Sequence, residues 1–106
     1  MTPTIEQQHP ATEEIQLTEV LAALSDPLRL EIVRRLDADG QERTCGSFDL
    51  PIAKSTATHH FRVLREAGLI ASREEGTKKY NRIRREDLDR RFPGLLDSIL
   101  DQVDAQ

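Results

Sequence analysis

The chain has 106 residues, of which 37% are hydrophobic and 32% charged, and its formal net charge at pH 7 is −4. This length favours one domain with a modest core, and no apolar run approaches the roughly 18 residues of a membrane-spanning helix. A single cysteine, Cys45, excludes an internal disulfide framework and a metal cage built from the cysteines of one chain. The acidic, polar N-terminus has neither signal-peptide nor transit-peptide features, so we expect a cytoplasmic protein.

The charge is distributed unevenly along the chain. Residues 1–53 hold four basic and ten acidic side chains, and residues 92–106 hold three acidic and no basic ones. Between them, residues 54–91 hold eleven basic and six acidic side chains, a local balance of +5. A basic block between acidic flanks favours an anionic partner such as nucleic acid, against the alternative of a merely solvated charged surface.

Residues 1–11 contain two prolines and little apolar content, which predicts a disordered arm followed by one domain over residues 12–106. From Thr12 onward we expect an amphipathic helix, because apolar residues recur at the i, i+3, i+4 and i+7 positions. These residues are Leu17, Val20, Leu21 and Leu24.

Asp26 and Pro27 predict the start of a second helix, since aspartate is a good N-cap and proline suits the first helical position. This helix should end before Gly40. Residues 47–50 can form one short helix that Pro51 would end.

A third helix is expected over residues 55–67, with Gly68 just beyond its end. Its apolar face consists of Ala57, Phe61 and Leu64. Residues 69–74 and 78–84, separated by a turn that contains glycine, predict a β-hairpin.

The strongest helical period lies near the C-terminus. It is formed by Phe92, Leu95, Leu96, Ile99, Leu100 and Val103. This stripe is too wide for one small domain to bury alone, so we expect a dimer interface with the helix that contains Leu17, Val20, Leu21 and Leu24. The alternative is a stripe that serves only the core of its own chain.

The predicted order is helix, helix, short helix, helix, hairpin, helix. It indicates a mainly α fold with a small β-hairpin wing, a winged helix-turn-helix dimerised through its N- and C-terminal helices. A helix of roughly 10–12 Å diameter fits the ~12 Å major groove of DNA. The third helix presents hydrogen-bonding side chains opposite its apolar face, and Lys54 adds positive charge to its N-terminus.

Two segments resemble the ArsR/SmtB family of bacterial transcriptional repressors: residues 23–32 (ALSDPLRLEI) and 55–70 (STATHHFRVLREAGLI). Residues 76–80 (GTKKY) resemble that family's wing, and the resemblance spans residues 16–91. It implies a homodimer that binds a partly palindromic DNA operator and blocks transcription.

The resemblance also implies that base contacts are made by Ser55, Thr56, Thr58 and His59. Wing cations near phosphate would be Arg73, Lys78 and Lys79. With the cations of the third helix, the expected DNA-binding residues are Lys54, Ser55, Thr56, Thr58, His59, Arg62, Arg73, Lys78 and Lys79.

The metal-ligand sets used by related repressors are absent from this sequence. Related repressors use paired cysteines, or Asp and His ligands on the last helix, whereas this chain has one cysteine and no histidine after His60. The adjacent His59 and His60 point about 100° apart on a helix and cannot easily chelate one ion. We therefore expect no metal and no cofactor.

Cys45 is most simply a partly buried small residue, and we expect no catalytic residues and no enzyme activity. Two alternatives stay open. The chain could be a metal- or redox-responsive repressor acting through Cys45, or a protein-interaction module that has lost DNA binding.

Overall fold

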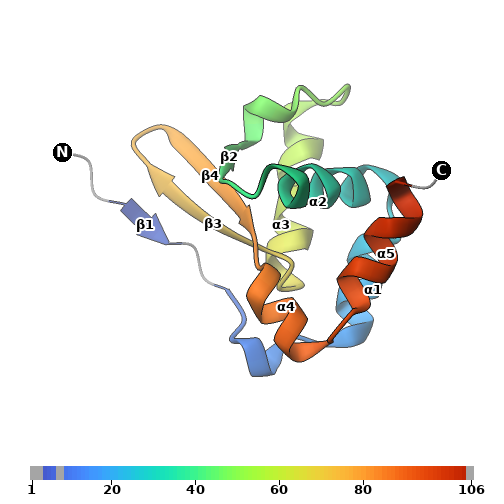
Figure 1. Cartoon of the computed structure of the whole chain (residues 1–106). Helices are drawn as coiled ribbons and strands as arrows, with labels where there is room; N and C mark the ends of the chain where they lie inside the picture. Colours follow the sequence, from blue (N-terminus) through green and yellow to red (C-terminus); the bar gives the residue numbers. More distant parts are fainter. Residues whose placement is uncertain (1–3, 7–8, 105–106) are drawn as a thin grey trace.

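The computed structural model describes residues 4–6 and 9–104. Its elements are β1 (Thr4–Glu6), the 3₁₀ helix η1 (Thr12–Glu14), α1 (Leu17–Leu24), α2 (Pro27–Asp39), β2 (Arg43–Thr44), the 3₁₀ helix η2 (Cys45–Phe48), α3 (Lys54–Glu66), β3 (Ile70–Glu75), β4 (Lys78–Ile83), α4 (Arg85–Arg91) and α5 (Leu95–Asp104). This is the predicted mainly helical fold with a small antiparallel sheet (Figure 1).

The corner between α1 and α2 forms as the sequence predicts. The Asp26 carboxylate accepts hydrogen bonds from the backbone N–H groups of Leu28 and Arg29, at 2.8 and 3.1 Å. Pro27 occupies the first turn of α2, where no backbone donor is needed. Gly40 ends the helix with a φ of +65°, so the chain turns away towards β2.

The end of α3 is also encoded locally. The Gly68 N–H donates to the Arg65 carbonyl and the Leu69 N–H donates to the Leu64 carbonyl, at 3.1 and 3.0 Å. Gly68 has a φ of +89°, a conformation that favours glycine. This hydrogen-bond pair stops the helix and directs the chain into β3.

β3 and β4 form the expected hairpin with Gly76 and Thr77 at its tip. The sheet order is β1-β3-β4-β2, and every pair is antiparallel. Figure 1 shows the hairpin projecting from the helical body as a wing.

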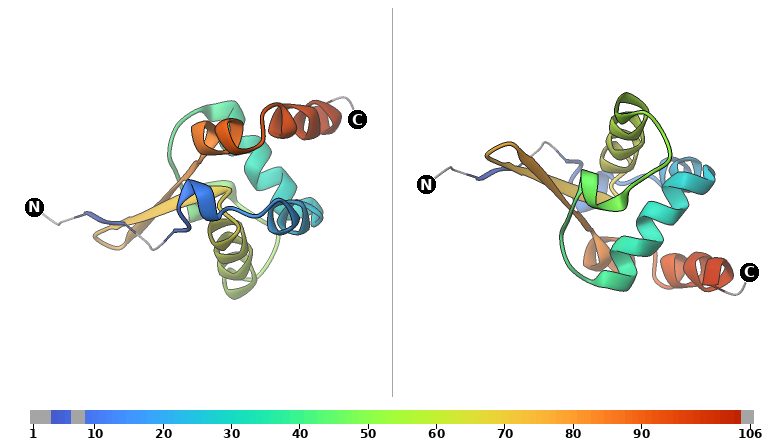
Figure 2. Two further views of the ribbon diagram at one scale, coloured as in Figure 1. Left: turned by 90° about the horizontal axis from the view of Figure 1, so that it is seen from below. Right: turned by 90° about the horizontal axis from the view of Figure 1, so that it is seen from above.

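The core lies where the helices meet the base of the wing. Its fully buried members include Ile32, Leu36, Leu64, Leu69 and Ile70. Figure 2 shows α3 on one side of this body and α5 on the opposite side. The core therefore separates the helix expected to read DNA from the helix expected to dimerise.

The N-terminal segment differs from the expected disordered arm. Thr4–Glu6 forms β1 and pairs with β3, while residues 1–3 and 7–8 lie outside the described residues. The His9 imidazole accepts a hydrogen bond from the Ser72 N–H at 2.8 Å. The edge of β3 has unpaired backbone groups that β1 can bind. The composition of residues 1–11 does not reveal this partner.

The helices also differ from the prediction at several points. The short helix expected over residues 47–50 forms earlier, as η2 (Cys45–Phe48), and ends at Asp49, before Pro51. Residues 12–14 form the 3₁₀ turn η1, so α1 begins later than expected. The stripe that starts at Phe92 is interrupted by Gly94, whose φ of +80° is not helical, and α5 begins only at Leu95. The sequence prediction did not include α4, a short helix whose buried residue is Leu88.

Candidate nucleic-acid interface

The outer face of α3 is polar and exposed. Phe61 and Leu64 are buried in the core and Ala57 is half-buried, so the opposite face of the helix points outward. The six side chains predicted on that face are all exposed: Lys54, Ser55, Thr56, Thr58, His59 and Arg62. The structure thus brings the predicted contacts of the third helix together on one surface.

Three of these side chains make contacts within the helix. The Thr58 hydroxyl donates to the Lys54 carbonyl at 2.9 Å. Nη2 of Arg62 lies 3.3 Å from Nδ1 of His59. The pairing leaves the other nitrogen of the His59 ring directed away from the Arg62 contact, and an exposed imidazole can donate to or accept from a base edge.

A groove of about 580 Å³ separates α3 from the wing. Its lining includes five cationic side chains, and we call it the basic groove: Lys54, Arg62, Arg65, Lys78 and Lys79. Within the described residues, Lys79 is the only one of the five with an ion pair, to Glu74 at 3.8 Å. The remaining positive charge is available to an external polyanion.

Arg65 is a member of the basic groove that sequence reasoning missed. The signal was its spacing, because Lys54, Thr58, Arg62 and Arg65 follow one another at intervals of four, four and three residues. Residues at these intervals share one face of a helix.

Arg73 lies apart from the other predicted DNA contacts. Neighbouring residues of a strand point to opposite faces of the sheet, and Arg73 pairs with Tyr80 whereas the next pair joins Glu74 to Lys79. Its guanidinium stacks on the Tyr80 ring at 4.5 Å and bonds Glu42 and Glu75. These carboxylates raise the pKa of the Arg73 guanidinium and hold it on the outer face of the wing.

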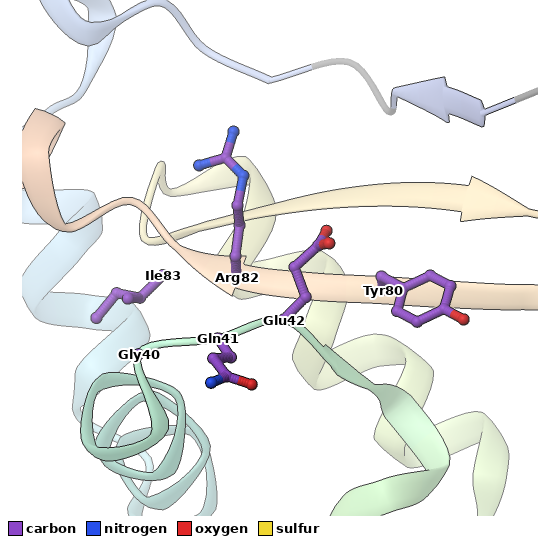
Figure 3. Close-up of a pocket in the computed structure, with 6 residues that line it drawn as sticks. All are labelled: Gly40, Gln41, Glu42, Tyr80, Arg82 and Ile83. Atoms are coloured by element: carbon purple, nitrogen blue, oxygen red, sulfur yellow. The ribbon is translucent and has the colours of Figure 1, made fainter.

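A second cavity, of about 570 Å³, opens on this outer face. Its lining is Gly40, Gln41, Glu42, Tyr80, Arg82 and Ile83. Figure 3 shows the Glu42 carboxylate and the Arg82 guanidinium pointing to the same side of β4. Hydrogen bonding from Arg73 lowers the pKa of Glu42, and the charge of Arg82 acts in the same direction. Positive charge on this face is therefore partly compensated by Glu42.

Cys45 is half-buried beside the basic groove. Nδ2 of the buried Asn81 donates to the Cys45 sulfur at 3.1 Å, and the Ser72 hydroxyl donates to Oδ1 of Asn81 at 2.7 Å. Across residues 4–6 and 9–104, no group of three or more His, Cys, Asp or Glu side chains is arranged to hold a metal ion.

The residues predicted at a dimer interface divide into two groups. Val20, Leu24, Leu96 and Leu100 are buried in the core of their own chain, so their apolar surface is already covered. Leu17 and Leu21 are 43% and 44% exposed, and four further residues are half-buried: Phe92, Leu95, Ile99 and Val103. Residues of α1 and α5 lie close enough to line one small cavity of about 10 Å³ together. Packing within the chain therefore covers part of the stripe.

Across the described part of the chain, every helix is too short or too polar to span a bilayer.

Comparisons with known proteins agree with this geometry. A family model described as a helix-turn-helix domain matches residues 24–73, from the end of α1 into the wing. YceK, an uncharacterized HTH-type transcriptional regulator of Bacillus subtilis strain 168, is 40% identical over 83 residues, which cover 76% of this chain and 83% of YceK. MJ1325, an uncharacterized HTH-type transcriptional regulator of Methanocaldococcus jannaschii, is 37% identical over 60 residues, 56% of this chain and 67% of that protein.

A similar fold occurs in a solved structure. The crystal structure of the ArsR family transcriptional regulator RHA00566 superposes with a TM-score of 0.65 at 20% identity. The match covers 93% of this chain and 99% of that one. At this identity, the likeness concerns the fold.

Proposed function

Because this chain belongs to the helix-turn-helix transcriptional regulators and has the ArsR-type winged fold, we propose that it represses transcription in the cytoplasm as a homodimer on a partly palindromic operator. It would act by occupying DNA, without catalysis. In this proposal α3 enters the major groove and the wing lies along the flanking phosphates.

The observation that carries the proposal is the placement of the basic groove beside the polar face of α3. Base edges are read by hydrogen-bonding side chains, and Thr56, Thr58 and His59 supply them from one exposed surface. The cations of the groove lie next to that surface, where the sugar–phosphate backbone would pass. This placement supports a surface on which α3 reads bases while the neighbouring cations bind phosphate.

Dimerisation is proposed through α1 and α5. Leu17 and Leu21 expose apolar surface on α1, and the C-terminal helix lies on the side of the body opposite α3 (Figure 2). A second copy docked there would leave both α3 helices free. Two such helices reach successive major grooves about 34–36 Å apart, which predicts half-sites separated by one helical turn.

The test starts with the DNA upstream of the protein's own gene and with DNA selected from a random pool by the purified protein. We expect both to yield a partly palindromic site that is bound more tightly than random DNA in gel-shift titrations. The exposed His59 should supply one base contact, so His59→Ala should reduce the preference for that site by about 1–3 kcal/mol.

Gln41→Ala is the matched control, because Gln41 is exposed, lines the outer cavity and belongs to none of α1, α3 and α5. It should bind operator and random DNA as the wild type does. If selection enriches no sequence, operator binding is refuted. If His59→Ala weakens operator and random DNA equally, His59 contacts phosphate and base reading belongs to other residues.

A further inference from the structure

One arginine joins three helices at the corner between α1 and α2. Nε of Arg29 donates to the Ala23 carbonyl at 2.7 Å, and Nη2 lies 3.5 Å from the Ala22 carbonyl, both at the end of α1. Nη1 lies 3.2 Å from Nδ1 of His60, in the middle of α3. A guanidinium has donors only, so Nδ1 of His60 is the acceptor and its proton lies on Nε2.

The location of Arg29 explains why it is held firmly. Carbonyl groups at the C-terminus of α1 carry partial negative charge, which attracts the guanidinium. The backbone N–H of Arg29 is itself bound by the Asp26 cap at 3.1 Å. Backbone and side chain of Arg29 are thus both anchored at the corner, and the bond to His60 extends this anchor to α3.

The described core contacts of α3 are apolar. Phe61 and Leu64 attach the helix to the core, and apolar contacts are not directional. A hydrogen bond fixes a direction as well as a distance. His60 follows the exposed His59 and lies four residues after Thr56, so its position sets where both of those side chains point.

We infer that Arg29 is a positioning residue for DNA recognition, which through His60 fixes the rotation of α3 and so directs Thr56 and His59 towards the base edges. This inference rests on the proposed operator binding. A role confined to capping α1 would need only the bonds to Ala22 and Ala23. The third bond, to His60, connects Arg29 to α3, the helix proposed to read DNA.

The test compares variants on the operator selected by the wild-type protein and on random DNA. Arg29→Lys keeps the positive charge at the end of α1 but has no fork that reaches both sites, and His60→Leu removes the acceptor. His60→Asn keeps an acceptor, Oδ1, close to the position of Nδ1. Arg29→Lys and His60→Leu should each lower the operator preference about tenfold, and His60→Asn should restore most of it.

A double-mutant cycle separates positioning from independent roles. If Arg29 acts through His60, the combined Arg29→Lys and His60→Leu variant has the same operator preference as either single variant. Additive effects would overturn the inference. So would an Arg29→Lys variant that shifts the melting temperature but leaves the ratio of operator to random affinity unchanged.

A measurement without DNA distinguishes this inference from the proposed function. Nitrogen-15 spectra of the histidine rings at neutral pH should show His60 with the proton on Nε2 and a bare Nδ1, and Arg29→Lys should change the Nδ1 signal. A proton on Nδ1 in the wild type would overturn the Arg29 link even if operator binding holds. Failure to select any operator, with the expected ring spectrum, would refute the proposed function instead.

Discussion

Arg73 of the wing and Glu42 of the segment before β2 form a two-pronged ion pair, with Nε to Oε2 at 2.7 Å and Nη2 to Oε1 at 2.9 Å. The pair joins residues 31 positions apart in sequence. Together with the pairing of β2 on β4, it ties the wing to the segment between α2 and α3. Arg73 thus orients the wing, and it is not among the residues that line the basic groove.

The two faces of the wing should respond differently to salt. Lys78 and Lys79 border the basic groove, so the Lys78→Ala and Lys79→Ala double variant should bind all DNA sequences more weakly. Each phosphate that a protein no longer neutralises reduces the slope of log K against log salt by about 0.9, and we expect a decrease of about 2. Gel-shift titrations between 50 and 200 mM salt, roughly the range in which such slopes are resolved, measure it.

Arg82→Ala is the matched control for this experiment. Arg82 is on the same strand but lines the outer cavity with Glu42. Its removal should leave the salt slope unchanged. An unchanged slope in the double lysine variant would place the phosphate contacts outside the wing, and a slope lowered by Arg82→Ala would bring the outer face into contact with DNA.

The ion pair between Glu42 and Arg73 should make stability depend on pH. Hydrogen bonding from Arg73 holds the pKa of Glu42 below its ordinary value of 4.5 in the folded protein. The unfolded chain therefore binds more protons near that pH, and this contribution to stability is present above 4.5 and is lost as pH falls through the lowered pKa. Glu42→Gln should accordingly be less stable than the wild type at neutral pH, with a difference that shrinks on acidification.

Urea denaturation at a series of pH values measures this difference. In an Arg73→Ala background, Glu42→Gln should cause little further change, because the partner that lowers the pKa is gone. A difference between wild type and Glu42→Gln that grows as pH falls would contradict the assigned direction.

Elements that depend on neighbours in sequence could be predicted, and contacts between distant residues could not. Asp26 and Pro27 start α2 and Gly68 ends α3 because each satisfies or redirects backbone groups within one turn. In contrast, the contacts of Arg29 with His60 and of Arg73 with Glu42 form only when the chain has folded. No local sequence pattern predicts either partner. The same limit explains β1, because the edge it covers is created by a hairpin some 70 residues later.

The apolar stripe of the last helix shows this limit most clearly. Its period correctly predicts a helix and an apolar face, but period alone does not say which surface covers that face. Leu96 and Leu100 are buried in their own chain. The exposed leucines that can meet a partner are on α1.

Leu17 and Leu21 provide the test of the proposed dimer. Because both are more than 40% exposed in one chain, the Leu17→Glu and Leu21→Glu double variant should remain folded and sediment as a monomer. Leu96→Ala is the contrasting variant: it should lose about 2–5 kcal/mol of stability, as expected for a buried leucine. Sedimentation velocity and urea denaturation distinguish the two effects, and a surviving dimer in the double glutamate variant would place the interface elsewhere.

The contact between Gly68 and Ile15 yields a last prediction, on how the N-terminal segment packs against the end of α3. A Cβ added at Gly68 would lie 2.6 Å from Cγ1 and 2.9 Å from Cδ1 of Ile15, which is 1% exposed and enclosed by the core. Gly68 also has a φ of +89°, so Gly68→Ala should combine backbone strain with overpacking and lose about 2–5 kcal/mol in urea denaturation.

Gly76→Ala at the wing tip isolates the backbone part of that loss. Gly76 has a φ of +63°, and a Cβ there would meet no atom within 4 Å, so we expect a loss of only about 1–2 kcal/mol. If the two variants lose the same stability, Ile15 yields without cost and the N-terminal segment is packed loosely. A larger loss at Gly68 means that the segment before α1 is part of the core, because only a side chain that cannot move aside adds an overpacking penalty to the backbone strain.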